Sequence, residues 1–271
     1  MIHPAMPELP EVETIVRRFA PDLVGRRILN FSADWPRQLQ PSRAAVQKAL
    51  KGRVIGVLGR RGKHILMPLD DGRHLLIHLK MSGRLAFVDE EHRPSHVRAR
   101  FLLDDGRELR VVGARKFGRL RLVDQVDEAL AHLGPEPLDP SLKPARLRTR
   151  LDSKRPLKAL LLDQERLAGL GNIYSDESLH RARLHPLRPG ASLDAQEAAR
   201  LLRAIRQVLD LAIRQCGTSL DWIYPGGKMQ DYLKVYGRSG QPCPGCRQPI
   251  EKIRVAQRST HFCPRCQPGP G

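Results

Sequence analysis

The sequence has no long apolar run, no internal repeat and comparatively few acidic residues. None of its hydrophobic stretches approaches the ~18 residues of a transmembrane helix, and no short apolar core follows a basic start, as it would in a signal peptide. Asp and Glu number 29 against 47 Lys and Arg, which gives a net charge of +18 and a pI of about 10.5. These features exclude a membrane protein, disfavour a secreted one and favour a cytoplasmic protein that binds a polyanion. Nucleic acid fits this charge better than a membrane surface does.

Cysteine is also scarce, but its spacing is informative. Four of the five cysteines form two C-x2-C pairs, Cys243/Cys246 and Cys263/Cys266, with sixteen residues between them. Two such turns supply four thiolates, which complete a tetrahedron around one structural zinc ion and leave no open coordination position. Disulfides are the weaker alternative in a chain without a secretion signal. Cys216 is expected to end an apolar-striped helix as a buried or partly buried thiol without a chemical role.

The length of 271 residues allows one or two domains, and the pattern changes along the chain. An opening helix with apolar residues at helical spacing ends before Gly25, and a succession of short strands follows, with turns at Asp70-Asp71-Gly72 and Asp104-Asp105-Gly106. The expected strands are 27–31, 53–58, 64–69, 74–79, 84–88, 97–103, 107–112 and 119–123. Beyond about residue 140 the pattern becomes helical, most clearly from Ser192 to Ala212.

These patterns predict an α+β protein: an N-terminal antiparallel β-sandwich with flanking helices, then a helical domain that ends in a zinc ribbon. The expected divisions are a leader at 1–6, the sandwich at 7–133, a linker at 134–140, the helical domain at 141–236 and the ribbon at 237–271. Within the ribbon, residues 250–255 and 260–262 are expected to pair as a hairpin, with a turn at 256–259. Arg258 would then lie near the tip, where its guanidinium could contact phosphate, although an exposed arginine on a hairpin is more often simply solvated.

The segment Met6-Pro7-Glu8-Leu9-Pro10 contains a proline that could act as a nucleophile. An N-terminal proline is a secondary amine with a pKa of roughly 8, so part of it is unprotonated and nucleophilic at neutral pH. Pro and Glu are also ordinary residues for the start of a helix, which is the alternative interpretation. Because residues precede Pro7 in the printed sequence, the chemistry requires a new terminus. We expect translation to start at Met6 and the methionine to be removed.

Three further motifs accompany this segment and the cysteine pairs in a fixed order. They are His78-Leu79-Lys80-Met81-Ser82-Gly83, Arg115-Lys116-Phe117-Gly118, and Gly169-Leu170-Gly171-Asn172-Ile173-Tyr174 followed by Asp176-Glu177-Ser178-Leu179. Together they resemble the formamidopyrimidine-DNA glycosylases over nearly the whole chain. The resemblance implies a DNA glycosylase and abasic-site lyase of base-excision repair that removes oxidised purines and contains a helix-two-turns-helix motif.

The resemblance also implies roles for individual residues. Pro7 would attack C1′ of the damaged nucleotide, Glu8 would assist opening of the sugar ring by proton donation, and Lys63 and Arg258 would act near the lesion phosphates in the elimination chemistry. The implied DNA contacts are Met81 in the emptied space, Arg115 on the orphaned base, Phe117 as a wedge, and Lys154 and Asn172 on the backbone, where exposed amides at a helix start would also bind phosphate. The implied partner is damaged double-stranded DNA in the bacterial cytosol or nucleoid. The protein would be a monomer with no small-molecule cofactor.

Some positions depart from the family pattern. Gly113-Ala114 stands where the family commonly has an aspartate before the arginine, so the support behind Arg115 is expected to differ. A DNA-contacting family histidine aligns with Pro94 rather than His96, and its role is transferred to neither. The lesion-sensing loop is expected within 219–232, with flexibility at Gly226-Gly227-Lys228.

Two alternatives remain from the sequence. One is an endonuclease VIII-type glycosylase for oxidised pyrimidines, which Leu9 disfavours because that branch more typically begins Pro-Glu-Gly. The other is a non-catalytic zinc-ribbon protein that only binds nucleic acid.

Overall fold

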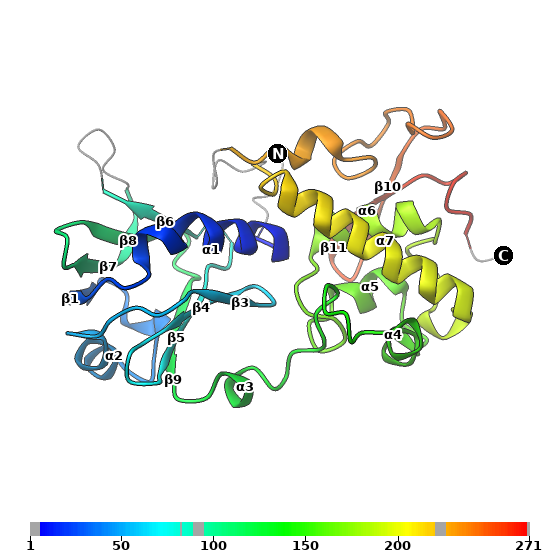
Figure 1. Ribbon diagram of the computed structural model, residues 1–271. Helices are drawn as coiled ribbons and strands as arrows, with labels where there is room; N and C mark the ends of the chain where they lie inside the picture. Colours follow the sequence, from blue (N-terminus) through cyan, green and yellow to red (C-terminus); the bar gives the residue numbers. More distant parts are fainter. Residues whose placement is uncertain (1–5, 82, 89–94, 220–225, 270–271) are drawn as a thin grey trace. The chain divides into compact units, whose positions relative to one another are not determined.

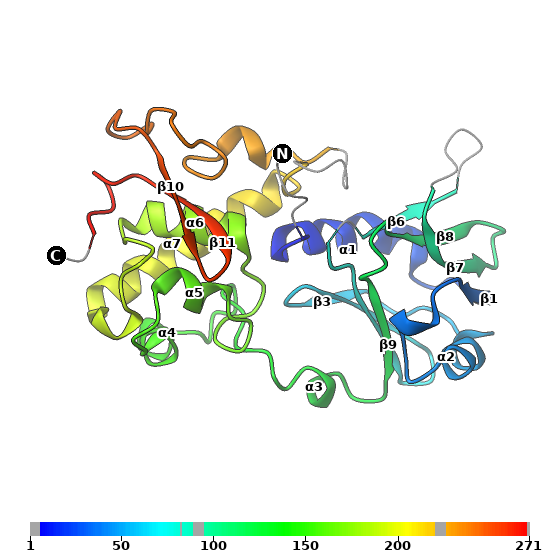
Figure 2. The ribbon, with the colours of Figure 1, turned by 180° about the vertical axis from the view of Figure 1, so that it is seen from behind.

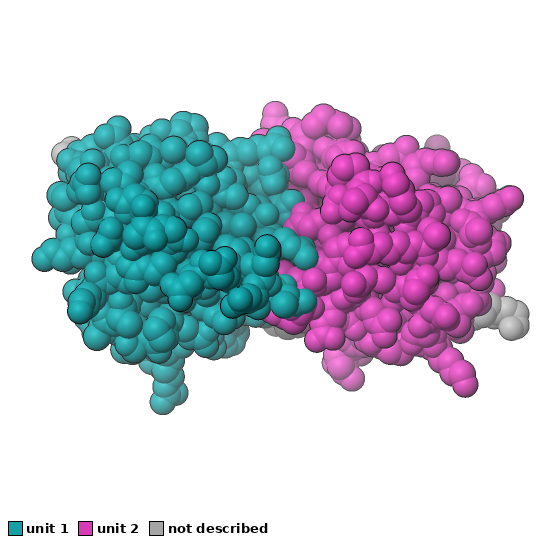
Figure 3. All heavy atoms as spheres, turned by 60° about the horizontal axis from the view of Figure 1, so that its bottom comes forward, with its two compact units in different colours: residues 1–7, 11–131, 219–226 teal, residues 8–10, 132–218, 227–271 magenta. Residues whose placement is uncertain are grey.

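The computed structural model describes residues 6–81, 83–88, 95–219 and 226–269, and the chain divides into two compact units (Figure 3). Unit 1 comprises residues 1–7, 11–131 and 219–226, and unit 2 comprises residues 8–10, 132–218 and 227–271. The expected leader up to Ala5, Ser82, Pro94 and positions 220–225 of the expected lesion-sensing loop lie outside the described residues.

Unit 1 is built on two β-sheets (Figures 1 and 2). The four-stranded sheet has the order β1 (Ile28–Ala33), β7 (Val97–Leu103), β8 (Glu108–Val112), β6 (Arg84–Phe87). The five-stranded sheet has the order β2 (Leu39–Gln40), β9 (Arg119–Val123), β5 (His74–His78), β4 (His64–Pro68), β3 (Gly59–Arg61). All neighbouring pairs are antiparallel except β2 and β9, which are parallel.

One hydrophobic core joins the two sheets, as in a β-sandwich. Phe31 and Phe101 from the first sheet share a cluster of buried side chains with Ile65 and Ile77 from the second. Helix α1 (Leu9–Leu23) adds one face to the same cluster, with Val12, Ile15, Val16, Phe19 and Leu23. Gly25 follows with φ of 82°, a left-handed conformation that glycine adopts without steric cost, and the chain turns there into β1.

Several elements differ from expectation. The strand predicted at 53–58 is wrong, because Val54 and Ile55 form only isolated bridges with Arg27 and Leu69. Helix α2 (Arg43–Leu50) is unpredicted, although Ser42 caps its N-terminus by accepting a hydrogen bond from the Ala45 N–H. The short elements η1 (Pro36–Gln38), β2, β3 and α3 (Val126–Ala129) are also additions to the prediction.

Unit 2 is mainly helical. Its elements are α4 (Pro144–Leu151), α5 (Leu157–Leu162), α6 (Asn172–Ala182), η2 (Gly190–Ser192), α7 (Ala195–Arg214), η3 (Met229–Tyr232) and the strand pair β10 (Glu251–Val255) and β11 (Arg258–Phe262). The longest helix, α7, starts with a capping box in which the Asp194 and Glu197 side chains each accept a backbone N–H of the other. Cys216 was expected to be at least partly buried, which is wrong: it is exposed, with φ of 57°, just beyond the end of α7.

The α+β class, with its sheets, helical domain and terminal ribbon, is confirmed. Among the described residues, no helix is both long and apolar enough to cross a membrane.

Candidate functional site

The Glu8 carboxylate caps helix α6 from a distant part of the sequence. It accepts hydrogen bonds from the backbone N–H groups of Gly171 at 2.6 Å, Ile173 at 2.9 Å and Tyr174 at 3.4 Å. The first N–H groups of a helix have no partner within the helix, and Gly171 at the N-cap has no side chain to supply one. Glu8, which is 2% exposed, takes that role and places its negative charge at the positive end of the helix dipole.

The two glycines of the Gly169-Leu170-Gly171 motif allow this close approach. A Cβ on Gly171 would lie 2.4 Å from Cδ of Glu8, and a Cβ on Gly169 would lie 2.6 Å from Cδ1 of Leu9. Both distances are far below van der Waals contact. The motif therefore holds the backbone against Glu8-Leu9, and the Leu9 N–H donates to the Gly169 carbonyl at 3.0 Å.

The amides at the start of α6 were expected to be exposed, and those of Gly171, Ile173 and Tyr174 are not available to a phosphate in this structure. The N–H groups of Ile173 and Tyr174 belong to buried residues and are engaged by Glu8. Asn172, the first residue of α6, is only partly buried, and its Nδ2 donates to the Ser259 carbonyl at 2.9 Å. The structure thus brings Asn172 beside the residue that follows Arg258.

Two adjacent acidic residues of α6 anchor the zinc-ribbon region. Oδ1 of Asp176 accepts a hydrogen bond from the ammonium of the buried Lys158 at 2.6 Å. Its other oxygen, Oδ2, accepts one from the backbone N–H of His261 at 2.9 Å. Glu177 accepts the N–H groups of residues 234–236, each at 2.9 Å. Burial raises the pKa of Glu177, while these three hydrogen bonds act in the opposite direction. The acidic motif therefore fixes both the segment directly before the ribbon and the second strand of the ribbon.

The ribbon hairpin presents Arg258 at its first paired position. Val255 pairs with Arg258, so the loop is only Ala256-Gln257, both with positive φ (48° and 62°), and the predicted turn over 256–259 is too long. This conformation suits the twist of a two-residue hairpin. Arg258 is exposed, and Lys154, between α4 and α5, is exposed as well.

In unit 1, Lys63 lies in the tight turn between β3 and β4. Arg61 and His64 pair across this turn, and Gly62 has φ of 57°. Lys63 is only 5% exposed, an unusual degree of burial for a lysine. Pro7 is also buried.

Two loops of unit 1 carry the other three expected DNA contacts. Met81 follows β5, whereas Arg115 and Phe117 lie between β8 and β9, and the Arg115 guanidinium lies 3.8 Å from Sδ of Met81. Phe117 is 50% exposed, which contradicts a core role for this aromatic ring. The structure therefore brings Met81 and Arg115 together and leaves the Phe117 ring exposed in the same loop.

A neutral histidine, His78, accepts a hydrogen bond from the backbone of the loop that carries Met81. The Lys80 N–H donates to Nδ1 of His78 at 3.0 Å, and Lys80 has φ of 53°. Burial, together with the nearby His64 and positive lysines, lowers the pKa of His78 to about 2. The imidazole therefore stays neutral at physiological pH and keeps its acceptor nitrogen.

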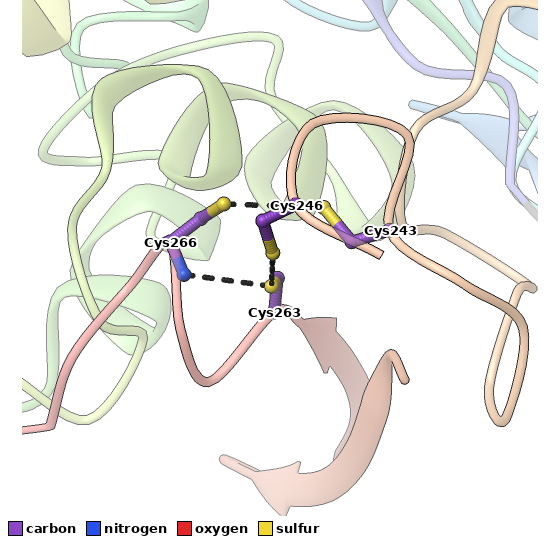
Figure 4. A group of neighbouring side chains, drawn as sticks. All are labelled: Cys243, Cys246, Cys263 and Cys266. Atoms are coloured by element: carbon purple, nitrogen blue, oxygen red, sulfur yellow. Dashed lines mark hydrogen bonds between the residues drawn. The ribbon is translucent and has the colours of Figure 1, made fainter. Parts of the chain in front are cut away.

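The four cysteines of the two C-x2-C pairs converge on one point (Figure 4). Their sulfur atoms all lie within 4.8 Å of one another, with 3.9 Å between Cys243 and Cys266 and 3.4 Å between Cys246 and Cys263. Zinc–sulfur bonds of ~2.3 Å in a tetrahedron require sulfur–sulfur distances of roughly 3.8 Å. The donor set fits one structural zinc ion, as predicted.

Helix α6 also reaches this zinc site through His180, whose Nε2 lies 3.5 Å from Sγ of Cys243. A zinc-bound cysteine is a thiolate and can only accept, so Nε2 donates to it. Replacing such an outer partner typically weakens metal binding 10–100-fold, so we expect His180→Phe to raise the zinc dissociation constant by roughly tenfold. Competition with a chromogenic chelator measures this change.

Arg181→Ala is the matched control, because Arg181 is exposed on the same helix and bonds Gln207 instead. Equal zinc retention by the two variants would contradict a contribution from His180.

Sequence reasoning missed Lys158, His180 and the anchoring role of the acidic pair. Lys158 interrupts an otherwise apolar stretch, Leu157 to Leu162, and is 0% exposed. A charge inside an apolar helix segment was the available signal, because such a charge requires a buried partner.

Three family models match the chain in order. They are the formamidopyrimidine-DNA glycosylase N-terminal domain at residues 6–120, the formamidopyrimidine-DNA glycosylase H2TH domain at 133–222, and the zinc finger found in FPG and IleRS at 240–269. The third match includes all four cysteines that converge on the zinc site.

Curated relatives and solved structures agree with these matches. Formamidopyrimidine-DNA glycosylase of Chloroflexus aurantiacus is 47% identical, over 97% of this chain and 98% of the relative. The enzyme of Symbiobacterium thermophilum is also 47% identical, over 98% of this chain and 90% of the relative.

Among solved structures, MutM in complex with DNA containing carbocyclic 8-oxo-G has a TM-score of 0.92 at 36% identity and covers 97% of this chain and 100% of that one. The Lactococcus lactis enzyme bound non-covalently to DNA with an AP site has a TM-score of 0.91 at 35% identity, with the same coverage. The three matched domains and the relatives that align over the full length show that this chain belongs to the formamidopyrimidine-DNA glycosylase family.

Proposed function

We infer that this protein is a base-excision repair DNA glycosylase and abasic-site lyase that removes oxidised purines, such as 8-oxoguanine and formamidopyrimidines, from double-stranded DNA. The observation that carries the inference is the pair Pro7-Glu8, in which the residue next to the proline is fixed by three backbone hydrogen bonds. The relatives named as formamidopyrimidine-DNA glycosylases support the same activity.

The proposed chemistry begins on the nitrogen of Pro7. With the base turned out of the duplex, the unprotonated amine attacks C1′, and the base leaves with the electron pair of its bond to C1′ and takes a proton from water. The proline nitrogen then loses its proton. Three N–H donors around Glu8 are the surroundings of a carboxylate, so Glu8 can accept that proton and return it to O4′ as the sugar ring opens.

Ring opening leaves an iminium between Pro7 and C1′, which acidifies the C2′ hydrogen. Transfer of this proton to water expels the 3′ phosphate and leaves a conjugated iminium. Loss of the C4′ proton to water then expels the 5′ phosphate, and hydrolysis of the iminium returns the Pro7 amine. Lys63 and Arg258 are proposed to stabilise these phosphates, because both carry the positive charge that the leaving groups require.

This chemistry requires that Pro7 be the first residue, because an amide nitrogen is not nucleophilic. We propose that the active protein starts at Pro7 after removal of Met6, and the N-terminal family model begins its match at residue 6.

The remaining residues are proposed to bind the DNA. Met81 fills the space left by the lesion, Arg115 contacts the partner base, and the exposed Phe117 ring stacks between bases. Lys154 and Asn172 contact the backbone. A cytoplasmic monomer without a small-molecule cofactor fits this activity, and the zinc ion supplies folding energy rather than chemistry.

Paired substrates test the proposal. Protein beginning at Pro7 is expected to cut duplex DNA at a single 8-oxoguanine opposite cytosine faster than at thymine glycol. The reverse preference would identify an endonuclease VIII-type enzyme. Tight binding without strand cleavage would identify a silent nucleic-acid-binding protein.

A further inference from the structure

The loop that carries Arg115 and Phe117 contains no acidic residue between Gly113 and Gly118. Gly113 and Ala114 stand directly before the arginine, and neither has a polar side chain that could hold the loop. The contacts that hold it come from strand β7. The Arg98 guanidinium donates from Nε to the Gly113 carbonyl at 2.7 Å and from Nη2 to the Ala114 carbonyl at 3.3 Å.

We propose that Arg98 is the positioning residue that fixes the Arg115–Phe117 loop for insertion into DNA. This inference rests on the proposed function of the protein. A guanidinium is planar and presents several N–H donors in a fixed arrangement, so two carbonyls of consecutive residues can be held together by one side chain. The backbone immediately before Arg115 is thereby tied to strand β7.

The backbone of Arg98 is itself secured from a second segment. Its carbonyl accepts the Asp34 N–H at 3.0 Å and the side-chain amide of Gln38 at 2.8 Å. Gln38 is 1% exposed, so this contact lies inside unit 1. The backbone of Arg98 is therefore fixed in position, so its side chain can hold the loop in place.

The same segment supports the other side of Arg115. Nζ of Lys116 lies 4.7 Å from the ring centroid of Trp35, within the range of a cation–π contact. Lys116 has φ of 58°, and its N–H donates to the Gly113 carbonyl at 3.4 Å. Arg115 thus lies between Ala114, which Arg98 bonds, and Lys116, which contacts Trp35. Its guanidinium lies beside Met81.

Arg100 is a matched control for Arg98. It lies two residues further along β7, and its guanidinium pairs with the Asp34 carboxylate at 2.8 Å and 3.1 Å. Removing either arginine deletes a similar charge and side chain from one strand. Only Arg98 bonds the carbonyls of the loop.

The test compares Arg98→Ala, Arg98→Lys and Arg100→Ala in protein that begins at Pro7. Two activities are measured: excision of 8-oxoguanine opposite cytosine and opposite adenine, and strand nicking at a preformed abasic site. Fluorescence of 2-aminopurine next to the lesion reports unstacking by the loop.

For Arg98→Ala we expect excision opposite cytosine to fall at least about tenfold, because the substitution removes both hydrogen bonds from the charged guanidinium, and losing even one such bond has about this effect when it serves only the productive loop conformation. The preference for cytosine over adenine and the 2-aminopurine signal should fall with it, while nicking at a preformed abasic site stays within about twofold of the unsubstituted protein. Arg98→Lys should be intermediate, because an ammonium cannot reproduce the fork, and Arg100→Ala should leave all readouts unchanged.

Three results would overturn the inference while leaving the proposed function intact. These are equal behaviour of Arg98→Ala and Arg100→Ala, an unchanged preference for the opposite base, or an equal loss of excision and nicking in Arg98→Lys with an unchanged melting temperature. Absence of both activities in the unsubstituted protein would instead refute the proposed function.

Discussion

Protein that begins at Pro7 is expected to form a borohydride-stable covalent adduct with duplex DNA carrying one 8-oxoguanine opposite cytosine, and protein that retains Met6 is expected to form none. The reason is the chemistry of one nitrogen. A terminal proline amine has a pKa of roughly 8 and a free lone pair, whereas the lone pair of the Met6–Pro7 amide is delocalised into its carbonyl. Denaturing gel electrophoresis of the reduced reaction measures the adduct.

DNA binding by both forms serves as the control for this comparison, because the attraction between a chain of net charge +18 and phosphates does not depend on one amine. An adduct of equal yield from protein that retains Met6 would show that another amine, such as a lysine, forms the imine.

A large loss of activity is also expected for Glu8→Gln. Glutamine keeps the shape of the side chain but cannot carry a proton between the proline nitrogen and O4′, and the loss of a proton-transfer group typically costs 10²–10⁴-fold. In the unsubstituted protein the Gly171 and Ile173 N–H groups donate to the Glu8 carboxylate. Glutamine would place an amide NH2, which is itself a donor, against one of them, so the hydrogen bond there is lost. Single-turnover excision measures the first effect, and thermal unfolding measures the second.

Glu13→Gln is a suitable control, since Glu13 lies further along α1 and pairs with Arg60 at 2.9 Å and Arg17 at 2.8 Å. We expect it to leave excision within about twofold of the unsubstituted protein, because Glu13 pairs with two arginines to which the proposed chemistry assigns no role. Excision by Glu8→Gln at the rate of Glu13→Gln would remove Glu8 from the proposed mechanism.

Local sequence patterns predicted those features correctly whose structure depends on residues within one short segment. The spacing of the cysteines fixed the four zinc ligands, because each pair belongs to one turn and zinc accepts a limited set of geometries. The apolar spacing of α1 and the strand pairs around 70–72 and 104–106 are local in the same sense.

Errors arose where a segment has several possible partners. Residues 53–58 have strand-like composition, yet Val54 and Ile55 form only isolated bridges, with Arg27 and Leu69. Cys216 follows an apolar stripe, but its backbone leaves the helix in a left-handed conformation that exposes the thiol. For residues 53–58 tertiary context overrode the local strand preference, whereas for Cys216 the local backbone conformation decided the exposure.

By itself the sequence determined the family motifs, the zinc ligands and the nucleophile candidate Pro7, because each depends on residue type and short spacing. Only the tertiary structure decided that Glu8 caps a helix 163 residues away in sequence, that Asp176 and Glu177 anchor the ribbon region, and that Arg98 holds the Gly113-Ala114 backbone. The physical reason is that a hydrogen bond needs two groups within about 3 Å. Chain folding, not sequence proximity, sets which groups meet.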